Sequence, residues 1–198
     1  MQLLASPSKL PEDEIFLLVQ ILNGAWGAFF RATPALLSRR LASGQLFLLA
    51  RGEAAPEELE YVHATYGLTP NDGVLPLGIL ETIDAVTGGA PARVPVPYAA
   101  LTAEGRWREP LSNADTLVFV DLTTAASRQR SGLGRDLVRC ALEHRKPHHK
   151  HVYTYTPNVP ALREWHVKRG ARETGVVLPG ARPGHSVPDG ALMDYSAA

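Results

Sequence analysis

A glycine-containing turn between an apolar segment and an amphipathic helix is the feature that most constrains this chain. Residues 117–122 (LVFVDL) are nearly all apolar and rich in valine and phenylalanine, which predicts a buried strand. The turn at residues 129–134 (QRSGLG) follows, and apolar residues then recur at helical spacing from Leu133 to Leu142. Such a turn exposes backbone N–H groups beside the positive end of a helix dipole. It therefore predicts an anion site suited to phosphate or pyrophosphate.

Two common phosphate-binding motifs do not fit this turn. A dinucleotide fingerprint read from Gly132 needs a glycine where Leu137 stands. A Walker loop needs Gly-Lys-Ser/Thr at its end, where the chain has Arg135 and Asp136. The remaining pattern is Q-x-x-G-x-G, with arginines at 128, 130 and 135. On this pattern alone, an ordinary strand-to-helix turn whose glycines only relieve backbone strain is an equally good interpretation.

A second strand and helix follow the first pair. Residues 151–156 (HVYTYT) form another β-type run, and Pro160 suits the first turn of a helix. Gly170 lies where the C-terminal cap of that helix belongs. One face of the predicted helix carries Leu162, Trp165, His166 and Arg169.

This order of motifs resembles the GNAT superfamily, the acyl-CoA-dependent N-acyltransferases. The resemblance rests on strand, Q-x-x-G-x-G, helix, strand, Asn158 and then W-H-x-x-x-G-A, and covers residues 116–178 well and 45–83 loosely. It implies an α+β fold with α/β/α-type layers, in which a mixed β-sheet is flanked by helices and its strands splay apart at the cofactor site. It also implies a single domain over residues 1–198, with a long insertion at 84–115 between the third and fourth strands.

The resemblance implies acetyl-CoA, bound through its coenzyme A moiety, as the cofactor. Backbone amides of the 129–135 turn would bind the pyrophosphate, and backbone groups of the preceding strand would pair with the pantetheine arm. Asn158 would face the cofactor. No metal is expected in this set. The expected cofactor-binding residues are Leu122, Thr123, Thr124, Gln129, Arg130, Ser131, Gly132, Leu133, Gly134, Arg135 and Asn158.

His166 is the candidate acid. Many relatives have a tyrosine four residues before the glycine that closes this helix, and that tyrosine protonates the departing thiolate; here the position holds His166. An imidazolium could donate a proton, because the unperturbed pKa of histidine lies near physiological pH. Alternatively, His166 is an amphipathic residue that packs beside Trp165 with its ring N–H satisfied.

Asp121 and Glu81 are the candidates for the general base. Asp121 lies between apolar neighbours in the strand before the turn, where a carboxylate has a raised pKa unless it is paired. Glu81 lies in the predicted strand 77–83, as a neighbouring-strand equivalent. Either carboxylate could instead be structural, capping a backbone group or pairing with an arginine. Enzymes of this kind also use a water chain without a single base.

Charge and cysteine content exclude several other classes of protein. Lys+Arg and Asp+Glu both number 20, so no excess charge favours nucleic acid or a membrane surface as a partner. The single cysteine, Cys140, excludes a disulfide framework and is expected to be buried. No apolar run is long enough to span a membrane, so we expect a soluble, cytoplasmic protein. Four histidines within residues 144–151 are expected in a solvated turn, with no metal.

The remaining elements follow from local patterns. Residues 53–72 contain a short helix at 56–66, and the long segment 87–113 carries Tyr98 and Trp107. This segment could cover the acceptor site or form a hairpin extension used for dimerisation. The other expected elements are helices at 12–26 and 35–42, the latter capped by Thr33 and Pro34, and strands at 45–50, 77–83 and 191–196.

Two functions are compatible with this pattern. The first is an N-acetyltransferase that moves an acetyl group from acetyl-CoA to a primary amine of a small-molecule or peptide acceptor. The second is a non-catalytic acyl-CoA-binding module or sensor that keeps the turn but has a degenerate acid/base set. Asp121 and the pair Thr123-Thr124 favour the first, whereas His166 in place of tyrosine favours the second. A homodimer is compatible with either.

Overall fold

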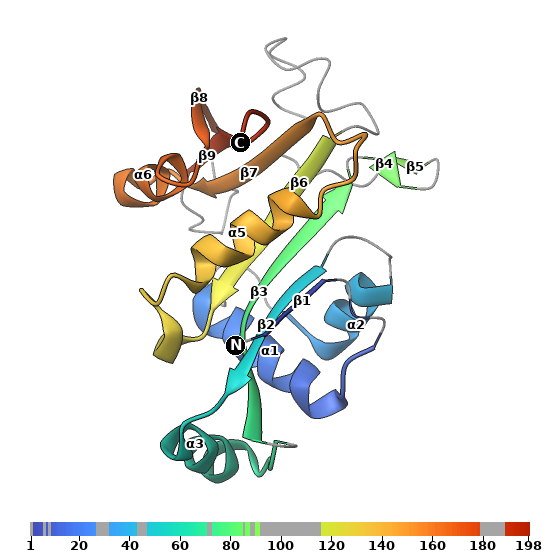
Figure 1. Cartoon of the computed structure of the whole chain (residues 1–198), viewed down its shortest axis with the longest axis vertical. Coiled ribbons are helices and arrows are strands. Elements are labelled where there is room, and N and C mark those ends of the chain that lie inside the picture. The colour runs from blue at the N-terminus through green and yellow to red at the C-terminus, as the bar shows by residue number, and fades with distance from the viewer. Residues whose placement is uncertain are drawn as a thin grey trace, which may run out of the picture. The chain divides into compact units, whose positions relative to one another are not determined.

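The computed structural model describes residues 2–5, 7, 9–26, 32–42, 47–70, 73–84, 86–87, 90–91, 116–178 and 189–198 (Figure 1). The chain divides into two compact units, each built from segments that are distant in sequence. The first unit draws on residues 1–81 and 121–141, and the second on residues 82–120 and 142–198. Strands β3 (Val74–Asp84) and β6 (Thr116–Thr124) and helix α5 (Leu133–Glu143) contribute residues to both units.

The first unit contains neighbouring antiparallel strands of the sheet, in the order β1-β2-β3. Its strands are β1 (Gln2–Ala5), β2 (Phe47–Glu53) and β3 (Val74–Asp84). Leu4 pairs with Leu49, and Leu49 pairs with Ile79 on the other side. The register shifts between Ala50 and Arg51. The two predicted strands of this unit are therefore present but longer than expected, since the structure adds 51–53 to the first and 74–76 and 84 to the second. Residues 45 and 46 lie outside the described residues.

Helices α1 (Glu12–Trp26) and α2 (Pro34–Ala42) contribute to a core cluster of the first unit. The Thr33 hydroxyl accepts a hydrogen bond from the N–H of Leu36 at 3.2 Å, which confirms the predicted cap. The carboxylate of Glu14 pairs with Arg51 and so joins α1 to β2. The core cluster combines apolar residues of both helices, their flanking segments and β2: Leu10, Leu18, Val19, Leu22, Ala32, Leu37 and Leu49.

Helix α3 (Pro56–Tyr66) lies between β2 and β3, with the bounds that the sequence predicts. Pro56 occupies the first turn, where its missing N–H is no loss. Gly67 ends the helix with a φ of 69°, a left-handed conformation that glycine adopts without strain. Its N–H donates to the carbonyl of His63 at 2.8 Å. The helix is mostly solvated, and Val62 is its buried residue.

The second unit contains strands in the order β6-β7-β9-β8. β6 runs parallel to β7 (His151–Pro157), whereas β9 (Gly190–Asp194) is antiparallel to both β7 and β8 (Arg172–Leu178). The predicted mixed α+β fold is thus confirmed. The last strand ends at Asp194, two residues earlier than expected. A turn follows the strand, and the N–H of Ser196 closes it by donating to the Asp194 carboxylate at 2.8 Å.

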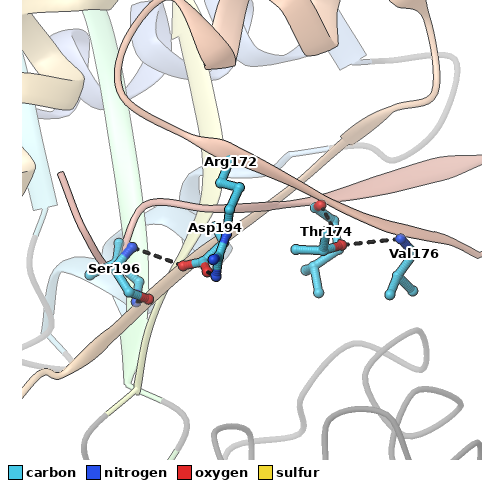
Figure 2. Close-up of polar contacts among 7 residues, drawn as sticks. Arg172, Thr174, Val176, Asp194 and Ser196 are labelled. Carbon is cyan, nitrogen blue, oxygen red and sulfur yellow. Dashed lines mark hydrogen bonds and ion pairs between the residues drawn. The ribbon is translucent and has the colours of Figure 1, made fainter.

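A bulge in β8 explains why the sequence pattern does not reveal this strand. The register between β8 and β9 shifts between Glu173 and Val177, and Gly175 has a φ of 75°. Figure 2 shows how Thr174 closes the bulge: its hydroxyl accepts from the N–H of Val176 at 3.1 Å. The same hydroxyl donates to the carbonyl of Leu192 at 2.9 Å. The bulge breaks the alternation of apolar and polar residues that would mark a strand.

Helix α6 (Pro160–Val167) and a short two-stranded pair complete the second unit. The pair joins β4 (Val86–Thr87) to β5 (Ala90–Pro91) and opens the predicted insertion. The rest of the insertion, with Tyr98 and Trp107, lies outside the described residues. None of the helices in the described ranges is long and apolar enough to cross a membrane.

Candidate functional site

The 129–135 turn has a conformation in which left-handed residues bracket Ser131. A short 3₁₀ turn at Ala126–Arg128 precedes it, and Gln129 is extended. Arg130 has a φ of 63° and Gly132 a φ of 90°, after which α5 begins at Leu133. Gly132 adopts this conformation freely, whereas a left-handed Arg130 is unfavourable by roughly 1–2 kcal/mol. Left-handed residues on both sides of Ser131 are typical of backbone turns that form anion-binding nests.

Several N–H groups of this turn are free to bind an anion. The Asp136 N–H donates to the Gly132 carbonyl at 3.1 Å, and the Leu133 N–H donates weakly to the Ser131 hydroxyl at 3.4 Å. No partner among the described residues takes the remaining donors, which are the N–H groups of Arg130, Gly132, Gly134 and Arg135. Because α5 begins here, its dipole adds partial positive charge at the same place.

Cationic side chains add to the positive character of the turn. Arg130 is exposed, and the Arg135 side chain is 62% exposed. The Arg135 guanidinium lies over Gly132: its Nη2 is 3.2 Å from the position that a Cβ at Gly132 would occupy. Asp136 holds it there through a 3.1 Å bond from Nε to Oδ1. The charge of Arg128, by contrast, is paired, because its guanidinium forms an ion pair with Glu58 at 2.7 Å.

The end of β6 lies in the same unit as the turn. Leu122, Thr123 and Thr124 are its last three residues, and Thr123 is 4% exposed. The N–H of Ala125 donates to the carbonyl of Leu77 at 2.7 Å and so anchors the end of β6 to β3. The first unit therefore contains every predicted cofactor-binding residue except Asn158.

The two candidate bases also belong to the first unit. Asp121 lies in β6, directly before Leu122, and Glu81 lies in β3, opposite Phe47 of β2. The catalytic role of either carboxylate stays a prediction.

Asn158 and His166 belong to the second unit, where β6 and β7 pair in parallel from Thr116↔His151 to Phe119↔Thr154. β6 then continues to Thr124 and β7 to Pro157. Asn158 directly follows β7, and its N–H donates to the carbonyl of Asp189 at 2.6 Å.

His166 is buried in α6, with 8% of its surface exposed. Its Nδ1 lies 2.7 Å from the hydroxyl of Tyr195, and its ring contacts Trp165 edge to face at 4.9 Å between centroids. Burial, and then the positive charge of Arg169, lower the pKa of His166 from 6.5 to about 4. Burial raises the pKa of Tyr195. At neutral pH the imidazole is therefore uncharged, and its Nδ1 shares a hydrogen bond with the Tyr195 hydroxyl.

Three contacts of these networks are not evident from the sequence. Tyr195 is separated from His166 by 29 positions and Arg128 from Glu58 by 70, so neither pair has a local signal. The third involves Ser131, whose hydroxyl donates to the Arg128 carbonyl at 2.7 Å. Its place just before α5 is a helix-cap pattern that could have been noticed.

Of the four histidines in residues 144–151, His149 is buried, with 5% of its surface exposed, and so departs from the solvated turn that the sequence predicts. His148 and His149 contact each other at 4.4 Å between ring centroids, and His149 Nδ1 accepts from the Lys146 N–H at 3.2 Å. In the described ranges, no three or more His, Cys, Asp or Glu side chains come together to hold a metal ion. Cys140 is buried, as predicted.

The chain resembles known proteins in its structure and not in its sequence. No protein-family model and no curated protein sequence match it. It is similar to ribosomal-protein-alanine N-acetyltransferase from Brucella melitensis, with a TM-score of 0.60, 15% identity and 98% of each chain covered. It is similar to Arabidopsis thaliana NAA60 in complex with a bisubstrate analogue, with a TM-score of 0.61, 13% identity and 98% of each chain covered.

A third similar structure is a candidate acetyltransferase of the GNAT family from Desulfovibrio desulfuricans. Its TM-score is 0.55 and its identity 15%, over 98% of this chain and 97% of that one. Identities this low establish architecture and not activity. The mixed sheet, the 129–135 turn and these comparisons agree: the chain has the fold of the GNAT superfamily.

Proposed function

We propose that this protein is an N-acetyltransferase that transfers the acetyl group of acetyl-CoA to a primary amine of a small molecule or peptide. The observation that carries the proposal is the set of unpaired N–H groups in the 129–135 turn, on a chain with the GNAT fold. Similar structures include an N-acetyltransferase of ribosomal-protein alanine and a protein bound to a bisubstrate analogue.

The pyrophosphate of coenzyme A is the anion that suits this turn. Its two linked phosphates would present several acceptor oxygens to the N–H donors of a turn that already has a defined backbone conformation, so little backbone ordering would be needed on binding. Arg130 and Arg135 are exposed beside these donors and add charge-assisted bonds. In the same unit, the backbone of Leu122, Thr123 and Thr124 would pair with the amides of the pantetheine arm.

The proposed reaction breaks the thioester C–S bond and forms an amide C–N bond. A neutral amine attacks the carbonyl carbon, its surplus proton passes to a base, and the departing thiolate takes up a proton. Holding amine and thioester together supplies much of the rate. Asp121 and Glu81 remain our candidates for the base, and a water chain is the alternative to both.

For His166, the structural observations support the packing alternative over the acid. An acid at neutral pH needs the imidazolium form, whereas burial holds the pKa of His166 at about 4. Its Nδ1 is also occupied by the hydroxyl of Tyr195 at 2.7 Å. We therefore expect His166→Phe to retain most of the turnover. A loss of about 100-fold in kcat with unchanged cofactor affinity would restore the acid role.

A non-catalytic acyl-CoA-binding module is the second candidate function. The specific observation in its favour is the same neutral, buried His166 in place of tyrosine. Thiol release from acetyl-CoA, followed with a disulfide reagent across a panel of amines and peptides, separates the two. Amine-dependent release above a no-protein blank supports the enzyme. Coenzyme A binding without release by any amine supports the module, and absence of binding contradicts both.

A further inference from the structure

A polar network links the inserted helix α3 to the 129–135 turn, entirely within the first unit. Glu58 lies in the first turn of α3. Its carboxylate accepts a hydrogen bond from the N–H of Ala55, the N-cap residue of the helix, at 2.9 Å. The same carboxylate oxygen, Oε2, accepts from Nη2 of Arg128 at 2.7 Å. That Nη2 also lies 3.4 Å from the carbonyl oxygen of Glu53, the last residue of β2. One carboxylate therefore holds both the start of α3 and the residue that precedes the turn.

The network continues from Arg128 into the turn itself. The Arg128 carbonyl accepts two hydrogen bonds from Ser131, one from the N–H at 3.3 Å and one from the hydroxyl at 2.7 Å. The Ser131 oxygen in turn accepts from the N–H of Leu133, the first residue of α5, at 3.4 Å. Because Ser131 lies between the left-handed residues Arg130 and Gly132, these bonds fix the part of the turn where the backbone changes hand.

Charge and burial show that the Glu58–Arg128 pair is a fixed contact. The two side chains are only 19% and 33% exposed. Burial alone would raise the pKa of Glu58, but the Ala55 N–H, the Ser127 hydroxyl and Arg128 together hold it below its ordinary value. A carboxylate that is ionised and paired in this way takes Arg128 out of the set of cations available to a phosphate.

We propose that Glu58 is a positioning residue for the anion-binding turn, which acts through Arg128 and Ser131 and orients the N–H groups of Arg130 and Gly132. The inference rests on the proposed function, because it assumes that these donors bind the pyrophosphate of coenzyme A. In this proposal, Arg128 supports the turn, whereas Arg130 and Arg135 contact the pyrophosphate. It also gives α3 a role in cofactor binding.

The test compares Glu58→Gln with Glu57→Gln. Glu57 is exposed in the same helical turn, so its variant removes an equal charge without touching Arg128. Titration calorimetry with coenzyme A should give a Kd about tenfold weaker for Glu58→Gln and within twofold of wild type for Glu57→Gln. Both variants should melt cooperatively without ligand. Equal affinities for the two variants contradict the proposal, and so does tighter binding by Glu58→Gln, which would mean that a freed Arg128 binds phosphate.

A double-variant comparison tests the path through Ser131. Ser131→Ala breaks the network at its last step, so adding Glu58→Gln to it should weaken coenzyme A binding little further. If the double variant loses affinity by the product of the two single-variant factors, Glu58 and Ser131 act independently. That result would contradict a role of Glu58 that acts through Ser131. Should Glu58→Gln fail to fold, Arg128→Lys and Arg128→Gln replace it. The lysine variant should stay within threefold of wild type while the glutamine variant loses about tenfold, and equal losses contradict the proposal.

A wrong function and a wrong role for Glu58 give different results in this experiment. If wild-type protein does not bind coenzyme A, the proposed function itself is wrong, and the inference falls with it. If wild-type protein binds and Glu58→Gln behaves like Glu57→Gln, only the positioning role is wrong.

Discussion

Replacing Gly132 with alanine tests whether the 129–135 turn depends on its left-handed backbone. Gly132 has a φ of 90°, and an L-residue held in the left-handed region loses roughly 1–2 kcal/mol relative to glycine. The added Cβ would lie 3.2 Å from Nη2 of Arg135. That contact adds little, because the guanidinium is the far end of a side chain that is 62% exposed and can move aside.

The expected result is a lower melting temperature for the ligand-free protein. A chain of this length shifts by roughly 2–4 °C per kcal/mol, so Gly132→Ala should melt about 2–8 °C below wild type by circular dichroism or calorimetry. Gly24→Ala is the matched control. Gly24 lies in α1 with no atom within 4 Å of the new Cβ, so helix propensity should make that variant equally stable or more stable, by up to about 1 kcal/mol.

A second variant separates backbone strain from the contact with Arg135. In an Arg135→Ala background, Gly132→Ala should still lower the melting temperature by the same amount, because the strain lies in the backbone. If Gly132→Ala no longer lowers the melting temperature in the Arg135→Ala background, the effect comes from the contact with the Arg135 side chain. An unchanged or higher melting temperature for Gly132→Ala alone would mean that the turn does not need a glycine at position 132.

Three further predictions follow from the same observations. Because the pKa of His166 is about 4 when folded and near 6.5 when unfolded, its contribution to stability is present above about pH 6.5. That contribution should fall by about 1.4 kcal/mol per pH unit as the pH drops towards 4, and urea unfolding of His166→Gln should lack this part of the slope. Arg130→Gly removes a non-glycine residue at a φ of 63°, so it should melt at or above the wild-type temperature while binding coenzyme A more weakly; a clear loss of stability would contradict the strain at Arg130. If Asp121 is the base, Asp121→Asn should remove the acidic limb of the pH–rate profile and leave the fold intact, whereas a lower melting temperature with an unchanged limb would make Asp121 structural.

Local signals in the sequence were sufficient for the elements that carry the turn. The apolar spacing of 133–142 predicts α5, and in the structure Leu133, Leu137, Val138 and Ala141 are all buried. Proline at a first turn and glycine after the last turn predict the bounds of α3. The Q-x-x-G-x-G pattern locates the glycine at which the backbone becomes left-handed, because few other residues tolerate that conformation.

What the sequence could not predict depends on contacts between distant segments. β1 has only four residues, QLLA, which is too short for a periodic pattern, and β8 is interrupted by its bulge. The state of His166 follows from burial and from Tyr195, which approaches from beyond β9. The pairing of Arg128 with Glu58 likewise depends on where α3 packs, and sequence spacing does not determine that.

The most direct test of acyl-CoA binding at the 129–135 turn is to measure how coenzyme A changes the melting temperature of the wild-type protein. Ligand at about a hundred times its Kd should stabilise the fold by roughly 2.7 kcal/mol, which for a chain of this size is a melting shift of about 5–10 °C. Adenosine, and NAD with its pyrophosphate but no pantetheine, should give much smaller shifts. Gly134→Glu, which adds bulk and negative charge at the start of α5, should abolish the coenzyme A shift while still melting cooperatively. No shift with the wild-type protein, or a full shift with Gly134→Glu, would contradict the assignment of the 129–135 turn to acyl-CoA.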